Sequence, residues 1–370
     1  MEKKNPIRVL HVLQRMEAGG TQALLMNIYR NIDRSKVQFD FLVEYPSKQF
    51  YDDEIMALGG KIYYTNVRND YNILKFEHQL KQILNENHYS IIHVHAYTIG
   101  YFALKTAKKC GVQVRIAHSH SNNMTNDLKK VLKKILQKIY PIYANEYMAC
   151  SKEAGKYLFK NKNYIVINNA IDSSKFIFSE KIRLKKRKEL GLENSFVIGH
   201  VGRFKPEKNH VFLLNVFCEV LKRCPNAKLL LIGNGDPNFD ILKKIEDLNI
   251  KNNVIILKNR KDVNELYQAM DVFVFPSLYE GLGIVAIEAQ ASGLPTICSE
   301  RLPLESNISP LYKKLSLALP IDSWVDEVVK EKKNRLAHQN MQQFVIKSGY
   351  DIKTTANYMQ DFYLKSGGKL

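Results

Sequence analysis

Residues 275–289 read FPSLYEGLGIVAIEA, and in this stretch an apolar strand passes through a glycine-containing turn into a helix. The run from Asp271 to Phe275 is rich in β-branched and aromatic residues, as strands buried in parallel sheets are. Gly281 and Gly283 let the backbone come close to a ligand, and the free N–H groups at the start of the following helix favour phosphate. The stretch therefore predicts a phosphate-binding strand–turn–helix unit of an α/β fold.

Glu288 extends the chemistry of this unit, because a carboxylate on the new helix accepts hydrogen bonds from hydroxyl groups. Backbone amides for phosphate beside a carboxylate for hydroxyls indicate a nucleotide-sugar pocket. Two alternatives stay open. The glycines fit an ordinary strand-to-helix turn with a solvated Glu288. Residues 281–286 also match the dinucleotide fingerprint G-x-G-x-x-A, with Glu300 in the place of the ribose-binding acid, although residues 276–280 separate Gly281 from its strand.

The same alternation of short apolar runs and helical patterns occurs in two series along the chain, which is typical of βαβ units around parallel sheets. Terminal helices are expected after residue 321. The expected strands are 7–13, 37–43, 61–65, 90–95, 112–117, 146–149 and 164–167 in the first series, and 196–201, 227–232, 254–257, 271–275 and 295–299 in the second.

We therefore expect an α/β protein made of two Rossmann-like, doubly wound domains that face each other across a cleft. The expected boundaries are 1–172 for an acceptor-binding domain, 173–345 for a nucleotide-sugar-binding domain, and 346–370 for a C-terminal helix. In open parallel sheets ligands lie outside the carboxyl ends of the strands, so the chemistry is sought in residues that follow strands.

Composition restricts the class of protein. The chain has 370 residues, of which 45% are hydrophobic, and a net charge of +18, which fits folded domains with a surface that attracts polyanions or an anionic membrane. Its five cysteines have no C-x-x-C spacing, so neither a disulfide framework nor a zinc site of that kind is indicated, and a reducing cytosol fits. No run is long enough to span a membrane, and no signal peptide is apparent.

Two further segments are candidates for phosphate binding. Gly202, Arg203 and Lys208 follow the strand expected at 196–201, where a guanidinium and an ammonium suit a diphosphate leaving group without a metal. The alternative is that both cations belong to a generally basic surface. Gly19 and Gly20 lie between the first strand and its helix and form a second helix start suited to phosphate.

Four histidines and one lysine-rich segment complete the candidates. His93 and His95 share one face of their strand, as His118 and His120 do on the next; no carboxylate or cysteine accompanies them at ligand spacing, so structural histidines are favoured over a metal site. The segment from Leu128 to Ile139 has an apolar stripe opposite five lysines, which suits either an anionic membrane surface or an ordinary surface helix.

Taken together, the motifs resemble the retaining glycosyltransferases of family 4, which have the GT-B architecture, and are closest to the bacterial exopolysaccharide and capsule transferases. The resemblance covers essentially the whole chain. It rests on HVL at 11–13 with the glycines at 19–20, RIAHSH at 115–120, ACSKEAG at 149–155, NAID at 169–172, GHVGR at 199–203, KNH at 208–210, and the long match from 271 to 295.

The resemblance implies roles for individual residues. Glu280 and the amides of Gly281, Leu282 and Gly283 would hold the donor sugar and diphosphate, and Glu288 the ribose. Arg203 and Lys208, beside Gly202, would neutralise the departing nucleoside diphosphate. His118 would lie against the transferring sugar, the Gly19–Gly20 loop would close over the phosphates, and the final helix would cross back to the first domain.

Two positions depart from the family pattern. Ala170 replaces the usual glycine of Asn-Gly-Ile-Asp, and Gln22 replaces an acidic residue after the glycine pair, so neither site is given a role. The expectation is a metal-independent enzyme, without a cofactor, that moves a hexose from a nucleoside diphosphate sugar, of uridine in the first instance, to a lipid-linked or surface glycan at the inner face of the membrane. The alternatives are a sugar-nucleotide epimerase of the same fold and, more distantly, an NAD-dependent oxidoreductase; no motif supports nucleic-acid binding.

Overall fold

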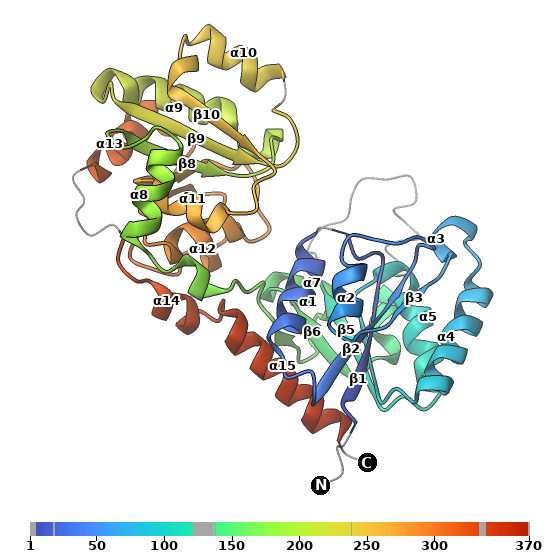
Figure 1. Ribbon diagram of the computed structural model, residues 1–370. Coiled ribbons are helices and arrows are strands. Elements are labelled where there is room, and N and C mark those ends of the chain that lie inside the picture. Colours follow the sequence, from blue (N-terminus) through green and yellow to red (C-terminus); the bar gives the residue numbers. More distant parts are fainter. Residues whose placement is uncertain are drawn as a thin grey trace. The chain divides into compact units, whose positions relative to one another are not determined.

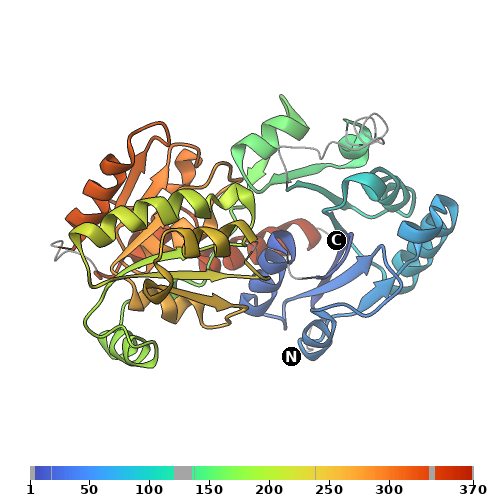
Figure 2. The same ribbon diagram turned by 90° about the horizontal axis from the view of Figure 1, so that it is seen from above.

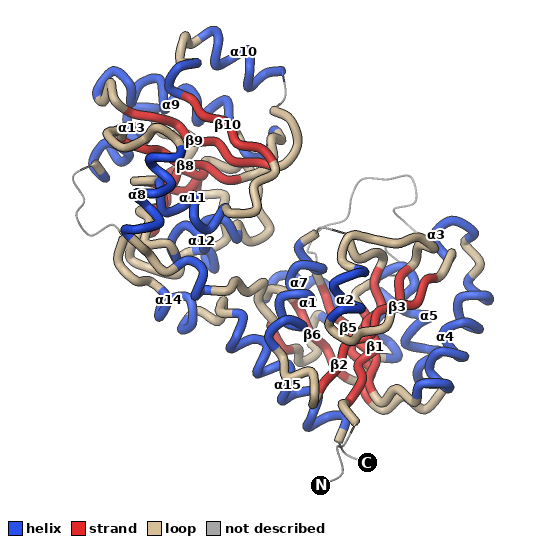
Figure 3. Tube along the Cα trace, in the orientation of Figure 1, coloured by secondary structure: helices blue, strands red, loops and turns tan. Residues whose placement is uncertain are grey.

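The computed structural model describes residues 5–17, 19–120, 136, 138–237, 239–332 and 338–368. The chain forms two compact units (Figure 1). Unit 1 comprises Met1–Ile171 together with Gly349–Leu370, and unit 2 comprises Asp172–Ser348. In each unit the strands, red in Figure 3, form a central layer between helices, so the α/β class expected from the sequence is confirmed.

Unit 1 is built on a seven-stranded parallel sheet of order β3-β2-β1-β4-β5-β6-β7. Its elements are β1 (Ile7–Leu13), α1 (Gly20–Asn31), β2 (Val37–Val43), α2 (Asp52–Ala57), β3 (Ile62–Tyr64), α3 (Val67–Asp70), α4 (Ile73–Asn87), β4 (Ile91–Val94), α5 (Tyr97–Lys109), β5 (Val114–Ser119), η1 (Tyr140–Tyr143), β6 (Glu146–Ala149), α7 (Lys152–Phe159), β7 (Ile165–Val166) and α15 (Ile352–Gly367).

Alternation along β1 places apolar side chains on both faces of this sheet, because successive residues of a strand point to opposite sides. Val9 and Leu13 join the core that contains α1 and α15, whereas Leu10 and Val12 join the core that contains α4 and α5. Both faces of the sheet are therefore buried, and this explains why the strands of this unit are nearly continuous apolar runs in the sequence.

The last helix, α15, belongs to unit 1, as the family resemblance implied (Figure 2). It packs beside α1, and its buried residues Ile352, Ala356, Met359 and Tyr363 complete the core on that face. The chain re-enters unit 1 through a short parallel bridge between Ile171 and Asp351. Residues from both ends of the sequence thus build one domain.

Unit 2 is built on a six-stranded parallel sheet of order β10-β9-β8-β11-β12-β13. Its elements are η2 (Ser173–Phe176), α8 (Glu180–Glu189), β8 (Phe196–Val201), η3 (Pro206–Lys208), α9 (His210–Arg223), β9 (Ala227–Gly233), α10 (Phe239–Asp247), η4 (Lys251–Asn253), β10 (Val254–Lys258), α11 (Val263–Ala269), β11 (Val272–Phe275), α12 (Ile284–Ala291), β12 (Thr296–Ser299), η5 (Leu304–Ser306), β13 (Tyr312–Leu315), α13 (Ile321–Glu331) and α14 (Gln342–Lys347).

The strand β13 was not expected from the sequence. It is the edge strand of the unit 2 sheet, where β12 is its one partner among the described strands, and all of its residues are partly exposed. Its sequence, Tyr-Lys-Lys-Leu, has two adjacent lysines and shows neither an apolar run nor a period of two. Lysine on an edge strand hinders pairing with another chain. The two lysines also interrupt the apolar pattern by which a strand is predicted from sequence.

In each sheet the strand order reverses at one point, although all of the strands run parallel. In unit 1 this switch point lies between β1 and β4, and in unit 2 it lies between β8 and β11. At a switch point the connections leave the two neighbouring strands toward opposite faces, which opens a crevice beyond their carboxyl ends. The fold therefore marks the residues after β1, β4, β8 and β11 as candidates for ligand binding.

The lysine-rich segment from Leu128 to Ile139 lies almost wholly outside the described residues, which include only Leu136, Lys138 and Ile139 of it. No helix in the described part of the chain is long and apolar enough to cross a membrane.

Gln290 ties α12 to the turn that follows β12. Its amide nitrogen donates to the carbonyl oxygens of Ala286 (2.9 Å) and Ser306 (2.7 Å). Its amide oxygen accepts from the backbone of Ile308 and from both the backbone and the hydroxyl of Ser309, each at 3.1 Å. The side chain is fully buried, so this one amide satisfies several groups that have no access to water.

Replacing Gln290 by Leu is expected to lower the free energy of unfolding by about 3 kcal/mol, because buried donors and acceptors lose their partners. Urea unfolding followed by circular dichroism measures the change. The matched control is Gln343→Leu on the exposed side of α14, which should stay within about 0.5 kcal/mol of wild type. Equal unfolding midpoints for the two variants would contradict the role of Gln290.

Candidate active site

The loops that follow β8 and β11 are hydrogen-bonded to each other at the switch point of unit 2. The carbonyl oxygen of Glu207 accepts from the backbone of Leu278 (2.8 Å) and from the hydroxyl of Ser277 (3.0 Å). The Asn209 amide donates to the carbonyl oxygen of Pro276 (3.1 Å). These bonds fix the relative positions of two segments that are far apart in the sequence.

Lys208 and Glu280 form an ion pair between these two loops. Their side chains are only 14% and 10% exposed, so the pair is largely desolvated. The Glu280 oxygen that accepts from Lys208 also accepts from the Ser277 hydroxyl at 2.6 Å, and the Lys208 ammonium lies 5.4 Å from the centre of the Phe275 ring. The structure therefore brings together Lys208, which the sequence proposed for the leaving diphosphate, and Glu280, which the family resemblance assigned to the donor sugar and diphosphate.

Gly202 and Arg203 lie beside this pair at the end of β8. A Cβ atom at Gly202 would be 3.2 Å from Nε2 of His200, which is a tight approach, and 3.4 Å from Cγ and Cδ of Lys208, which is an ordinary contact, so a side chain here would press on the histidine. Arg203 is exposed, and among the described residues its guanidinium has no hydrogen-bond or ion-pair partner. The site thus presents one cation that the described residues leave uncompensated.

Gly281, Leu282 and Gly283 lead into α12, which starts at Ile284. Gly283 caps the helix in a left-handed conformation with φ of 76°, which glycine adopts without strain, and no side chain caps the first turn. A Cβ atom at Gly281 would meet no atom of the described residues within 4 Å, so these residues leave the approach to this loop open. The free N–H groups of the helix start are suited to an anion.

Glu288 lies on α12 and accepts a hydrogen bond from the hydroxyl of Tyr267 on α11 at 2.9 Å. Burial raises the pKa of the Glu288 carboxyl to about 7, and the bond from Tyr267 lowers it in part. Tyr267 itself is fully buried, and its hydroxyl also contacts the carbonyl oxygen of Val285 at 3.2 Å. The tyrosine therefore holds the carboxyl in one orientation.

Glu300 does not act as the acid of a dinucleotide fingerprint in this fold. Its carboxylate accepts from the backbone of Leu317 at 2.8 Å and from the Ser316 hydroxyl at 3.3 Å, so it holds the segment after β13. The turn between the end of β11 at Phe275 and the start of α12 is also longer than the fingerprint requires. The geometry does not support the dinucleotide alternative.

Gly19, Gly20 and His118 belong to unit 1. Gly19 is the N-cap of α1 without a side-chain cap, and both glycines are exposed, so this helix start is also open to an anion. His118 lies near the end of β5 and is buried. Its Nδ1 is 3.0 Å from Nε2 of His93, and burial holds the pKa of the imidazole well below its ordinary value, so the ring is neutral.

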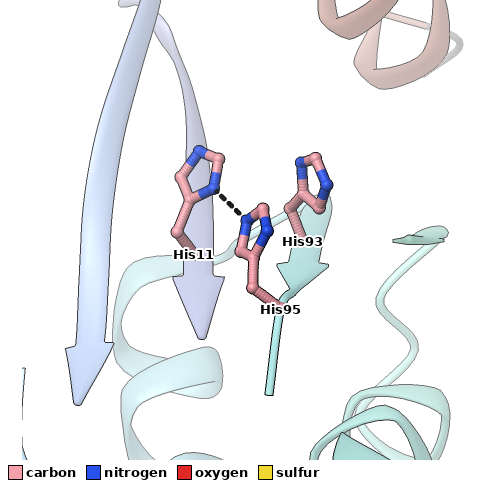
Figure 4. Close-up of side chains that lie close together, drawn as sticks. All are labelled: His11, His93 and His95. Atoms are coloured by element: carbon pink, nitrogen blue, oxygen red, sulfur yellow. Dashed lines mark hydrogen bonds between the residues drawn. The ribbon is translucent and has the colours of Figure 1, made fainter. Parts of the chain in front are cut away.

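The histidines expected to share strand faces do lie together, with one addition. His93, His95, His118 and His120 are joined by His11 of β1, whose Nδ1 is 3.1 Å from Nε2 of His95 (Figure 4). A period-two reading of the neighbouring strands could have placed His11 in this group. Tyr267 and Ser277, which orient Glu288 and Glu280, gave no signal in the sequence, because their partners are set by tertiary packing.

Comparison with known proteins places these residues in a family. Residues 182–352 match the family model "Glycosyl transferases group 1", and residues 18–175 match the model "Glycosyltransferase Family 4". EpsF of Bacillus subtilis, named as a glycosyltransferase, is 32% identical over 96% of this chain and 96% of its own length. An Escherichia coli enzyme named UDP-Gal:alpha-D-GlcNAc-diphosphoundecaprenol alpha-1,3-galactosyltransferase is 23% identical over 97% of both chains.

Among solved structures, Alr3699/HepE of Anabaena, crystallised in complex with UDP, superposes with a TM-score of 0.80 at 16% identity. The match covers 97% of this chain and 100% of that one, and shows the same fold. The two Rossmann-like sheets, the returning C-terminal helix and the full-length relatives agree: the chain belongs to glycosyltransferase family 4 and has the GT-B fold.

Proposed function

We propose that this glycosyltransferase is a retaining, metal-independent hexosyltransferase that uses a UDP-sugar and a lipid-linked or surface polysaccharide acceptor. The observation that carries the proposal is the set of groups after β8 and β11: the Lys208–Glu280 ion pair, the exposed Arg203, which has no partner among the described residues, and the uncapped start of α12. Uridine and the lipid acceptor are supported by the name of the Escherichia coli relative. The complex of the Anabaena protein with UDP supports the same nucleotide.

In this proposal unit 2 binds the donor. The free amides after Gly281 and Gly283 hold the diphosphate, Arg203 and Lys208 stabilise the charge that develops on it, and Glu288 accepts from ribose hydroxyls. Glu280 accepts from hydroxyls of the sugar while it stays paired with Lys208. His118 is assigned to the transferring sugar on the family resemblance, and its buried Nε2, which has no partner among the described residues, is the atom available for that contact.

The reaction breaks the bond between the anomeric carbon and the diphosphate oxygen and forms a bond from that carbon to the acceptor oxygen on the same face. The acceptor hydroxyl proton passes to the leaving diphosphate, which becomes a better leaving group as it is neutralised. Guanidinium, ammonium and helix N–H groups supply the positive field here, so the proposal needs no divalent ion at the diphosphate.

Neither alternative activity is favoured. The oxidoreductase reading needs a free ribose acid, and Glu300 is engaged by Ser316 and Leu317. An epimerase would share the fold, but the relatives that match over the full length carry glycosyltransferase names.

Peripheral association with an anionic membrane is part of the proposal and rests on the net charge of +18 and the lysines of residues 128–139. Co-sedimentation with anionic vesicles tests it.

A nucleotide panel in a thermal-shift assay tests the donor assignment. With EDTA present, UDP or a UDP-hexose is expected to raise the Tm, because a ligand bound only by the folded state stabilises it, whereas NAD is expected to leave the Tm unchanged. A rise with NAD and none with UDP compounds would overturn the transferase site. Loss of transfer in EDTA that Mg²⁺ restores would overturn metal independence.

Arg203→Ala is expected to lower kcat by about two orders of magnitude or more, since one preorganised contact to developing charge is removed. Transfer to a lipid-linked acceptor, followed with a labelled UDP-sugar, measures the loss. The control is Lys205→Ala, which removes an exposed cation from the same loop and should keep near-normal turnover. Similar rates for both variants would place the leaving group elsewhere.

The variant Glu288→Gln tests how the charge of Glu288 affects the stability of the fold and, separately, the binding of the donor. Because burial raises the pKa of Glu288 from 4.5 to about 7, the folded chain holds the proton more tightly than the unfolded chain does. The contribution of this group to the unfolding free energy therefore falls as pH rises from about 4.5 to about 7. Gln cannot ionise, so the variant should be more stable than wild type at pH 8 and equal to it near pH 4.

The same variant should bind a UDP-sugar more weakly at pH 8, because an amide offers one acceptor oxygen in place of two. Urea unfolding at both pH values and titration calorimetry with UDP provide the two measurements. A Gln variant that binds normally, or whose stability relative to wild type does not change with pH, would show that Glu288 is an ordinary surface residue of α12.

A further inference from the structure

Five imidazole rings gather at the switch point of unit 1, a place where this kind of sheet binds ligands. They come from three neighbouring strands: His11 from β1, His93 and His95 from β4 and the residue positions after it, and His118 and His120 from β5 and the position after it. All but His120 are at most 7% exposed. Figure 4 shows three of these rings turned toward one another.

The rings form two hydrogen-bonded rows. In the first, His95 lies between His11 and His120, with nitrogen–nitrogen distances of 3.1 and 2.7 Å. In the second, His93 lies between His118, at 3.0 Å, and the hydroxyl of Tyr363, at 2.8 Å. The rows stack on each other, with ring centres 4.3 Å apart for His93 and His95 and 4.0 Å apart for His118 and His120.

Each row ends in a buried ring nitrogen that has no partner among the described residues. These atoms are Nε2 of His11 and Nε2 of His118. A buried polar atom without a partner is costly, and in native proteins it usually marks a missing water, ion or ligand. A neutral imidazole whose other nitrogen donates a hydrogen bond offers its lone pair to a metal ion.

We propose that His95, His118 and His120 form a site for one borderline divalent transition-metal ion of the Zn²⁺ type. One ring nitrogen from each of the three lies within 4.8 Å of the others. Around a tetrahedral Zn²⁺ ion, ligand nitrogens are about 3.3 Å apart, given metal–nitrogen bonds of about 2.0 Å. The 2.7 Å contact between His95 and His120 therefore has to open by about 0.6 Å, and separations near the 4.8 Å limit have to close by about 1.5 Å.

The surroundings of the three rings match those of known metal ligands, whose second nitrogen is usually hydrogen-bonded. With Nδ1 of His95 on the metal, its Nε2 donates to His11. With Nε2 of His118 on the metal, its Nδ1 donates to His93, which in turn donates to the oxygen of Tyr363. The buried, unpartnered Nε2 of His118 is thereby used, and the order of donors in both rows becomes fixed.

The donor set also selects the ion. Three imidazoles without a carboxylate suit Zn²⁺, Ni²⁺ or Cu²⁺ and disfavour Mg²⁺ and Ca²⁺, which prefer oxygen ligands. His120 is partly exposed, which provides a way in from solvent. Three protein ligands leave one tetrahedral position for water or another small ligand. Nε2 of His118 cannot hold the ion and contact the sugar at once, because Nδ1 is bonded to His93. A bound ion is therefore expected to block the sugar contact of the proposed function, and transfer in EDTA is the reaction of the metal-free chain.

The test uses the full-length chain without a polyhistidine tag. Equilibrium dialysis against Zn²⁺ followed by elemental analysis is expected to give about one ion per chain. Co²⁺ in its place is expected to give the intense visible bands of a tetrahedral nitrogen-ligated ion. Binding of neither ion would overturn the proposal and would leave the cluster as a hydrogen-bonded imidazole network only.

His120→Ala removes the most exposed ligand and is expected to weaken Zn²⁺ binding at least tenfold and to abolish the Co²⁺ bands. Its circular dichroism and its thermal shift with UDP verify that it is folded. The control is His78→Ala, which removes an exposed histidine of α4 in the same unit and should bind Zn²⁺ as wild type does. Equal loss in both variants, or in neither, would show that the ion binds elsewhere.

Discussion

The ion pair between Lys208 and Glu280 is the interaction on which the arrangement of the donor half depends. The two residues are 72 positions apart in the sequence and belong to loops that follow adjacent strands. Because the pair is largely desolvated, removal of either partner would leave a charge without compensation in a poorly hydrated place. Ser277 and the backbone of Glu207 reinforce the link. The pair holds a cation and a carboxylate side by side, where a sugar and a diphosphate both need a contact.

The two cations at the end of β8, Lys208 and Arg203, differ in whether a carboxylate compensates their charge. Lys208 is paired, whereas Arg203 has no partner in the described part of the chain and is exposed. An anion that arrives at the end of β8 therefore gains the full attraction of Arg203 without breaking an existing bond. Glu288 shows the opposite design, since burial raises its pKa to about 7 and the fold is less stable when it is charged. Ionisable groups with shifted pKa values that lower the stability of the fold are typical of functional sites.

The two units repeat one topology with different chemistry. Each sheet has a single switch point, between β1 and β4 in unit 1 and between β8 and β11 in unit 2. In unit 2 the strand ends carry glycines and opposite charges, which suit a phosphorylated ligand. In unit 1 they carry neutral imidazoles, which suit a transition-metal ion. Fold therefore fixes where ligands bind, and the residues that follow the strands decide which ligands these are.

The sequence by itself determined the local structure and the family. Apolar runs predicted the α/β class, and the run at 7–13 became β1 without change, because burial on both faces demands continuous apolar residues. It did not reveal β13, whose half-exposed edge position requires no such pattern. Only the tertiary structure decided that Lys208 pairs with Glu280 and that His11 lies beside His95. Parallel pairing brings the ends of strands that are distant in sequence to one edge of the sheet, and periodicity along the chain carries no information about which strands become neighbours.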